Sequence, residues 1–493
     1  MFRSLKKPLC LFAALLSVGI PAAAAAPAAE EYGKRDVISE SVTESYTYSR
    51  KNNGTQIVAS PVTYLPDYTV DSDSLGAKLL NPSHIASRGG KLYIVNTGEN
   101  NIIITDENFK ILNTVSSFEN NGKTDGFSSP QGCYVTADGL LYIADTENCR
   151  IVVLDSDFKL VQIVGQPESE VLADDFVFKP KKVVVDSSKR FFVVSDGVYE
   201  GIMQFYENGD FIGFIGSIPV TASPIEIIWK KLLSKEQNSK RSQFVPVSYT
   251  NIFLDSEELI YTVSLSSTLA NPIRRLNLGG GDVLIRNSLA GIGVDGDQIG
   301  ETSQFAAVCA DESNTYYVAD SKQSRIFIYD EDGNLLNVFG GKYSGQIGTY
   351  RHISSLLICG NHLLVVDSQT SVITALAPTE YFCALRDGLY SYRNGAYEES
   401  AAKWKEALSF NSNFDLAYSK LGMIEVRNKN YGGAMEYFKL ANDQENYSKA
   451  YIKYRSEWYS ENLSVIITAL ILLVIAIAAV KACLKRRVRK NEG

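Results

Sequence analysis

The sequence predicts an all-β propeller of six blades, followed by a small all-α domain and one transmembrane helix. Three observations support this prediction. A short apolar phrase that ends in Asp, Asn or Ser recurs along residues 57–378. Residues 379–460 change to a helical pattern, in which several positions match at an offset of 34 residues. Residues 463–480 form an uncharged apolar run long enough to cross a bilayer.

Composition and charge narrow the function classes. The chain has 493 residues, of which 45% are hydrophobic and 21% charged, so it has the material for two or three folded domains and is not disordered throughout. The net charge is -8, and both termini are basic, so the body between them is more acidic than this value. An acidic body repels phosphate backbones, and we therefore expect no nucleic-acid partner.

Residues 1–26 have the pattern of a secretory signal peptide. Arg3, Lys6 and Lys7 precede a short apolar run over residues 9–20, and a series of alanines over residues 22–26 would suit a signal peptidase. The apolar run is short for a membrane span, although an uncleaved anchor is the alternative. We expect the residues after it to lie outside the cytoplasm, beginning with a linker over 27–56.

The recurring phrase defines the blades of the predicted propeller. Each copy is followed by a polar turn, a second apolar strand and a closing strand. The phrases end at positions spaced 47 to 68 residues apart, namely Asn96, Asp145, Asp196, Ser264, Asp320 and Asp367. Four short strands per unit of this length are typical of a propeller blade.

Two copies carry a family resemblance. The segments YIADTENCRIVVLD (142–155) and YVADSKQSRIFIYD (317–330) resemble the NHL-repeat β-propellers. The other blades are degenerate, because Asn101 and Val372 stand where these two blades have Arg150 and Arg325. The resemblance implies six blades over residues 57–378. We expect residues 57–70 to complete the last blade, which would close the ring and leave no exposed edge there.

One interval between phrases is longer than the rest and predicts an insertion over residues 217–244. Its apolar residues follow a helical stripe that includes Ile225, Trp229 and Leu232. We expect a helix packed on the propeller rim. A docking helix for a partner or for the membrane face is the alternative.

The helical region contains two copies of a 34-residue pattern. The matched pairs are Gly388 with Gly422, Tyr397 with Tyr431, Trp404 with Phe438 and Ala407 with Ala441. This pattern resembles tetratricopeptide (TPR) repeats, from which the first copy departs at Asp387, Ser400 and Ser412. We expect a third helix over 446–459 to cap the stack and to run on into the membrane helix.

The resemblance to TPR repeats implies a concave groove. On this analogy the groove is lined by Phe382, Leu385, Leu389, Tyr392 and Arg393 of the first copy and by Leu416, Met423, Val426 and Arg427 of the second. Two readings stay open. The helices either bind a peptide or protein partner in this groove, or serve as a spacer packed against the propeller.

The central channel of the propeller is the second candidate site. Aligning the first strand of each blade places His84, Gly132, Lys182, Asn251, Ala307 and His352 at the channel mouth. Ring closure would make His84 and His352 neighbours. We therefore take His84, Lys182, Asn251 and His352 as candidate ligand-binding residues, with a small molecule or a glycan as the candidate ligand.

Catalysis has weak support in the sequence. The chain lacks GxSxG, HExxH, P-loop and CxxC motifs. Lyases and lactonases that resemble this kind of propeller hold a metal, but Gly132 and Ala307 supply no ligand here and Lys182 would repel a cation. We therefore predict no catalytic residue, no metal and no cofactor, with a lactonase-like or lyase-like enzyme as the alternative. Asp145 and Arg150 are expected to tie strands together.

The cysteines do not suggest a disulfide framework. Cys10 falls in the signal and Cys483 follows the apolar run, which leaves an odd number between them. We expect buried thiols, with the pair Cys359 and Cys383 left open.

The C-terminal sequence predicts the membrane topology. Six Lys and Arg residues in 481–493 follow the apolar run 463–480 and favour a cytoplasmic tail. We therefore expect a single-pass protein of the cell membrane with its main body outside. The predicted function is an anchored binding or scaffold protein with a protein partner at the cell surface, accessory to an envelope or transport complex. A cell-surface carbohydrate sensor is a further alternative.

Overall fold

The computed structural model describes residues 45–51, 54–172, 175–217, 248–265, 271–286, 296 and 303–491. The predicted signal peptide and, apart from Ser217, the predicted helical insertion lie outside these residues. The chain divides into two compact units, one of residues 34–413 and one whose described part begins at Phe414.

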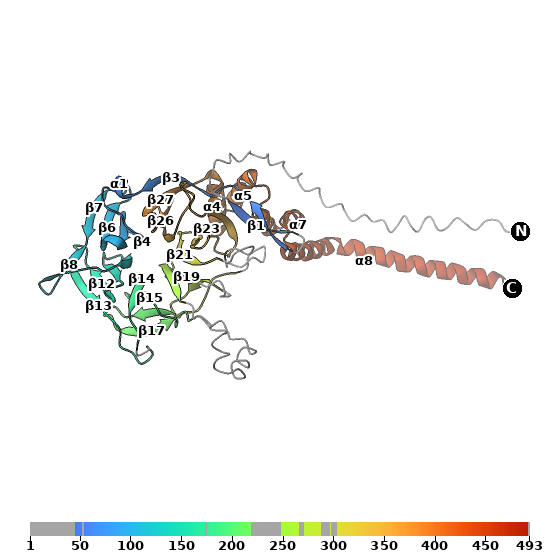
Figure 1. The fold of residues 1–493 in the computed structure, drawn as a ribbon. Helices are drawn as coiled ribbons and strands as arrows, with labels where there is room; N and C mark the ends of the chain where they lie inside the picture. The colour runs from blue at the N-terminus through green and yellow to red at the C-terminus, as the bar shows by residue number, and fades with distance from the viewer. Residues whose placement is uncertain are drawn as a thin grey trace, which may run out of the picture. The chain divides into compact units, whose positions relative to one another are not determined.

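Residues of the first unit form six antiparallel sheets arranged as the blades of a propeller (Figure 1). Blade 1 comprises β4 (Pro82–Arg88), β5 (Lys91–Asn96), β6 (Asn101–Asp106) and β7 (Ile111–Val115). Blade 2 comprises β10 (Pro130–Val135), β11 (Leu141–Asp145), β12 (Arg150–Leu154) and β13 (Leu160–Val164). Blade 3 comprises β14 (Lys179–Val185), β15 (Phe191–Asp196), β16 (Ile202–Phe205) and β17 (Phe211–Ile215).

The remaining blades follow the same order. In its described part, blade 4 has β18 (Tyr249–Leu254), β19 (Ile260–Ser264) and β20 (Ile273–Leu276). Blade 5 has β21 (Phe305–Ala310), β22 (Tyr316–Asp320), β23 (Arg325–Tyr329) and β24 (Leu335–Gly340). Blade 6 has β25 (Ile353–Cys359), β26 (His362–Asp367), β27 (Val372–Pro378) and the early strand β3 (Tyr64–Val70). Short elements between strands are α1 (Ser72–Leu75), η1 (Thr97–Glu99), β8 (Ser117–Asn120) and β9 (Lys123–Gly126).

The ring is closed, as the sequence predicted. Each blade's first strand contacts the first strand of the next blade, and β25 of blade 6 contacts β4 of blade 1. The closure is made by β3, which pairs antiparallel with β27 from Ile373 opposite Val70 to Pro378 opposite Tyr64. The prediction of six blades is therefore confirmed, and the strand that completes the last blade is Tyr64–Val70.

The structure differs from the expected linker over 27–56. In its described part this segment contains β1 (Tyr46–Lys51) and the start of β2 (Gly54–Ala59), which form a hairpin. The hairpin extends the outer edge of blade 5, where Tyr46 lies opposite Val338 of β24. Tyr46 and Tyr48 alternate with Thr47 and Ser49, and this alternation fits a strand although the segment as a whole is polar.

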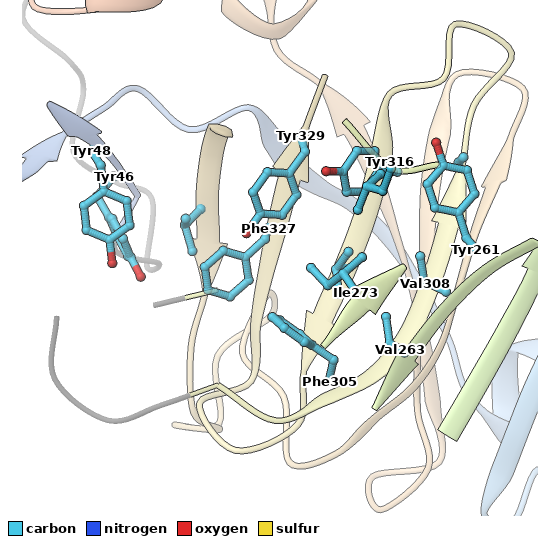
Figure 2. Close-up of a cluster of buried hydrophobic side chains, with 14 residues drawn as sticks. Tyr46, Tyr48, Tyr261, Val263, Ile273, Phe305, Val308, Tyr316, Phe327 and Tyr329 are labelled. Atoms are coloured by element: carbon cyan, nitrogen blue, oxygen red, sulfur yellow. The ribbon is translucent and has the colours of Figure 1, made fainter. Parts of the chain in front are cut away.

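The cores lie between adjacent blades. The cluster between blades 4 and 5 contains Val263, Ile273, Phe305, Val308 and Phe327, all nearly inaccessible to solvent (Figure 2). Figure 2 also shows the five tyrosines of this cluster, and the rings of Tyr316 and Tyr329 stack with centroids 5.1 Å apart. Burial of each large side chain stabilises the folded propeller by about 1.5–3 kcal/mol relative to leaving that side chain in water.

The turn between the first and second strands has a common design in several blades. In blade 5, Oδ1 of Asp311 accepts hydrogen bonds from the backbone N–H of Ser313 and Thr315. Asn314 then adopts a positive φ of 61°, a conformation that Asn tolerates better than most residues. Asp255 makes the same two backbone bonds to Glu257 and Leu259 in blade 4.

A helical hairpin completes the first unit. It consists of α4 (Glu380–Arg393) and α5 (Tyr397–Phe410). The hydroxyl of Thr379 caps α4 by accepting from the N–H of Phe382, and it donates to the carbonyl of Val62 at 2.8 Å. A Cβ atom added at Gly388 would lie 3.1 Å from the Trp404 ring, so the missing side chain lets the two helices approach closely.

The second unit consists of α6 (Asp415–Arg427), α7 (Tyr431–Leu440) and α8 (Gln444–Asn491). A Cβ atom added at Gly422 would lie 2.7 Å from the Phe438 ring. Phe438, Ala434 of α7 and Ala450 of α8 form a small buried cluster. The helix α8 continues without a break from this cluster through residues 463–480, as the sequence predicted, and it is long and apolar enough to cross a membrane.

Candidate functional site

The first strands of the six blades carry a β-bulge at the same place. In each first strand, one residue is skipped in the pairing with the second strand. The residue that follows the skipped one pairs with the last apolar residue of the second strand. We call the residues directly after the bulge the inner-ring positions, and they are His84, Gly132, Lys182, Asn251, Ala307 and Ser355. Five of them are the residues that the sequence alignment selected.

The sixth position is a correction. The alignment placed His352 in the ring, but the bulge of β25 lies between Ile353 and Ser355, and Ser355 occupies the ring position. Ile353 therefore corresponds to Pro82, which lies before the bulge, and not to the apolar residue Ile85 that lies after it. The tetrad Ile-Ser-Ser-Leu of β25 matches Pro-Ser-His-Ile of β4 and was the signal that could have found Ser355.

His352 has a different environment from His84. It precedes β25, where its Nδ1 lies 3.2 Å from Oγ of Ser368 and its backbone N–H donates to Asp367. Ser355 instead contacts blade 1, because its Oγ accepts from the N–H of Ile85 at 3.3 Å. The expected pair of His84 and His352 is thus replaced by a contact between Ser355 and blade 1.

The side chain of Lys182 joins three blades at the inner ring. It starts on blade 3, and its Nζ donates to the carbonyl oxygen of Gln131 in blade 2 at 3.0 Å and to that of Ser83 in blade 1 at 2.9 Å. A Cβ atom added at Gly132 would lie 3.1 Å from the Cα of Lys182 and would clash with the carbonyl of Lys181. Glycine at 132 is therefore what lets blades 2 and 3 approach.

Burial dominates the electrostatics of this region. Lys182 is 7% exposed, and burial lowers the pKa of its ammonium to about 7. His84 is more exposed than Lys182 when the whole residue is considered. Burial of its imidazole ring, and to a smaller extent the charge of Lys182, nevertheless lower the pKa of His84 well below its ordinary value. Burial also raises the pKa of the Cys133 thiol to about 12, so Cys133 stays protonated at neutral pH.

The third candidate residue that the structure keeps in the ring is Asn251. It is 3% exposed, and its position after the bulge of β18 is equivalent to that of Lys182 after the bulge of β14. The backbone carbonyl of Asn251 accepts from the hydroxyl of Thr262 at 2.9 Å. Among the hydrogen bonds of the described residues, none involves its side-chain amide.

Hydroxyl side chains near the channel tie each blade to the next. Oγ1 of Thr146 donates to the carbonyl of Pro180 at 2.7 Å, and Oγ of Ser354 donates to that of Pro82 at 3.0 Å. Thr97 makes the same kind of bond to Pro130, and Thr250 to Phe305. These bonds satisfy buried carbonyls at the start of the first strands, and we assign them a structural role.

The Asp and Arg of the repeated phrase also have a structural role in blade 2. Nε of Arg150 donates to Oδ2 of the inaccessible Asp145 at 2.8 Å, and its NH groups bind both carboxylate oxygens of Asp125. This network holds the β8–β9 hairpin to blade 2. In blade 3 the position of Asp145 is taken by Ser195 rather than by Asp196, because Pro180 pairs with Ser195 as Pro130 pairs with Asp145.

The described residues contain no group of three His, Cys, Asp or Glu side chains that is suited to hold a metal ion. Each described cysteine is a free thiol, including Cys359 and Cys383. The third histidine, His362, lies 2.9 Å from Asp67 of β3, so it supports ring closure.

The predicted groove residues of α4 do not share one open surface. Phe382 is fully buried against the propeller, where its ring centroid lies 4.8 Å from that of Tyr64. Arg393 forms ion pairs with Glu257 of blade 4 at 3.2 Å and with Glu331 of blade 5 at 3.6 Å. Phe382 therefore belongs to the interface between α4 and the propeller, which the alternative of a packed spacer had foreseen.

The other groove residues have mixed environments. Leu385 is fully buried like Phe382, whereas Leu389 and Tyr392 are partly exposed. In the second unit Met423 and Val426 pack against the cluster of α7 and α8, Leu416 is buried, and Arg427 is exposed. The two sets lie in separate units of the chain.

Comparison with known proteins finds one family model that matches a single blade and several distant structural likenesses. The family model named NHL repeat matches residues 127–154, which include most of blade 2. No curated protein matches the chain. Two structures of virginiamycin B lyase from Staphylococcus aureus are similar, each with a TM-score of 0.39. The first is 13% identical over 68% of this chain and 94% of that chain, and the second is 14% identical over 69% and 97%.

A structure from Bacteroides thetaiotaomicron, described as a structural genomics protein of unknown function, is 14% identical with a TM-score of 0.39 and covers 68% of this chain and 76% of its own. Likenesses at this level carry no argument about function.

Proposed function

We propose that this chain is a membrane-anchored, extracytoplasmic binding or scaffold protein. The propeller supplies a rigid binding domain, each helical hairpin supplies a further interaction surface of its own, and the apolar part of α8 holds the protein in the membrane. The observation that carries the proposal is the exposure of that apolar part. Val465, Leu472 and Val474 are each more than 60% exposed on a helix of 48 residues.

An apolar helix of this length needs a lipid environment. Residues 463–480 have the length of a bilayer core, and leaving so many large apolar side chains in water is unfavourable. The Lys and Arg residues that follow support a cytoplasmic tail, since basic residues are retained on that side. Tyr454, Trp458 and Tyr459 precede the apolar run by a short distance that suits the membrane interface.

The two hairpins support the proposed similarity to TPR repeats. In the first, Gly388 lies beneath Trp404, and in the second Gly422 lies beneath Phe438. Both pairs are separated by the same number of residues, and both put a ring where a glycine leaves room for it. This equivalence favours two copies of one helical unit, of the kind that presents surfaces to protein partners.

The site geometry does not favour the enzyme alternative. His84 occupies an inner-ring position whereas His352 precedes β25, and Lys182 is bonded to backbone carbonyls. The carbohydrate sensor gains no specific support from any described residue. The binding role therefore remains the proposal that fits most of the chain.

Membrane anchoring can be tested by comparing the full chain with a chain that ends at residue 460. We expect the full chain to stay with carbonate-washed membranes until detergent is added, and the shortened chain to be soluble. Release of the full chain by carbonate alone would contradict the proposal.

Orientation can be tested with a membrane-impermeant maleimide. The Lys159→Cys side chain, at a position that is 75% exposed on the propeller, is expected to react in intact cells. Cys483 is expected to react only after lysis. The reverse pattern would place the propeller in the cytoplasm. Crosslinking in intact membranes, with Arg427→Glu as the variant, then tests whether the second hairpin binds a protein partner.

A further inference from the structure

The inner ring gathers hydrogen-bond donors without a negative charge to match them. We propose that the channel binds a small organic carboxylate, held by Nζ of Lys182 with His84 and Asn251 as further donors. This inference rests on the binding role proposed above and names the chemistry of its ligand. Three observations support it, one for each residue.

The first is the incomplete pairing of Lys182. An ammonium group has three N–H donors, and the carbonyl oxygens of Ser83 and Gln131 accept two of them. The ionisable groups that act on Lys182 in the described structure are the Cys133 thiol, which is protonated, and Lys181, which is also cationic. A buried cation without a counter-charge is costly, and an anion at the third N–H would offset that cost.

The second observation concerns the hydrogen on His84. Its Nδ1 lies 3.3 Å from the backbone nitrogen of Cys133, which can only donate, so Nδ1 accepts and the ring hydrogen sits on Nε2. No described residue accepts a hydrogen bond from Nε2. Because His84 remains neutral beside Lys182, it offers a donor and adds no second charge.

The third observation is the unpaired amide of Asn251. Asn251 is only 3% exposed, and its side-chain amide has no hydrogen-bond partner among the described residues. The unpaired amide atoms of Asn251 are not fully sealed from solvent. The amide therefore faces space that a water molecule can enter. The strand β18 of blade 4 contacts β14 of blade 3, so Asn251 belongs to the blade next to that of Lys182.

These donors fit a carboxylate better than other ligands. A carboxylate has one negative charge, which matches the single ammonium, and its two oxygens can accept from more than one donor at a time. A phosphate dianion would leave a net negative charge, and a metal cation would be repelled by Lys182. The Ser355 hydroxyl is already engaged with Ile85, so it does not compete for the ligand.

The proposal links binding to pH. A carboxylate pairs with the protonated amine, and the pKa of Lys182 in the free protein is about 7. Above that pH the amine loses its charge, so binding must first take up a proton. The affinity should therefore fall by up to tenfold for each pH unit above 7.

The test is calorimetric titration of the full chain in detergent with sodium acetate, at constant ionic strength. We expect saturable binding that weakens roughly 20-fold between pH 6.5 and 8.5, given a pKa of about 7. Lys182→Met should weaken binding at least tenfold. The matched control is Lys179→Met, which removes a lysine of the same strand that pairs with Glu147 at 3.0 Å and should leave the affinity within about twofold.

A second variant keeps the test decisive if Lys182→Met does not fold. Asn251→Asp retains the side-chain shape and adds a carboxylate to the ring, so it should neutralise Lys182 from within and abolish acetate binding. The proposal is overturned if acetate does not bind, if binding is independent of pH or of Lys182, or if chloride binds as tightly as acetate. None of these outcomes bears on membrane anchoring, which the carbonate experiment measures separately.

Discussion

Nζ of Lys182 lies 2.9 Å from the carbonyl oxygen of Ser83, a residue 99 positions earlier and two blades away. One side chain therefore crosses blade 2 and links three blades at the centre of the ring. The crossing depends on Gly132, where blade 2 has no side chain. The centre of this propeller is thus partly filled by a lysine.

The role of Gly132 can be tested by Gly132→Ala. The added Cβ would clash with the carbonyl of Lys181 and crowd Lys182, both of which belong to the backbone of the next blade. We expect a loss of about 2 kcal/mol or more, seen as a lower Tm of the full chain in detergent. Gly165→Ala is the matched control, since a Cβ there has nothing within 4 Å. Equal Tm values for the two variants would contradict the close approach.

Lys182 also predicts a pH dependence of stability. Its pKa is about 7 in the folded chain and 10.5 in a model peptide, so the unfolded state binds more protons between these values. Stability should therefore rise with pH across this window, by about 2 kcal/mol between pH 7 and 9. Unfolding measured at both pH values should show this gain in the wild type and not in Lys182→Met. An equal gain in the variant would assign the effect to other groups.

The fold could be predicted from the sequence because its signals are periodic. The phrases that end at Asp145 and Asp320 recur with the strand pattern of a blade, and the apolar run before Lys481 has the length of a membrane span. The early hairpin was not predicted, since Tyr46 and Tyr48 are the only large apolar residues of β1 and their burial depends on a strand almost 300 residues away.

The candidate site was predicted in part for a related reason. Apolar patterns identify a first strand, but they do not show where its bulge falls, and the bulge decides which residue enters the ring. His352 was selected because Ile353 begins the apolar pattern, whereas the register places Ser355 there. Phe382 was assigned to a groove because the helical pattern does not show which face meets the propeller.

The ion network of blade 2 predicts a large effect for Arg150→Gln. Arg150 is the cation that pairs with the inaccessible Asp145 and with Asp125, and it lowers the pKa of Asp125 to about 2. Its loss would leave Asp145 buried without a cation, which costs roughly 3–5 kcal/mol in comparable sites. Lys159→Gln, which breaks an exposed pair with Asp157, is the control and should cost less than about 1 kcal/mol. Thermal unfolding of both variants provides the comparison.

The attachment of α4 to the propeller predicts a contrast between two aromatic residues of the same helix. Phe382 is inaccessible and packs between Tyr64 and Tyr317, whereas Tyr390 is 61% exposed. Phe382→Ala should cost about 3–5 kcal/mol and increase hydrogen exchange of α4 amides, because the helix loses its main apolar contact with blades 5 and 6. Tyr390→Ala should change neither the Tm nor the exchange rate by much. If Phe382→Ala left exchange in α4 unchanged, the polar contacts of Thr379 and Arg386 would have to hold the helix in place, and the assignment of Phe382 as its anchor would be wrong.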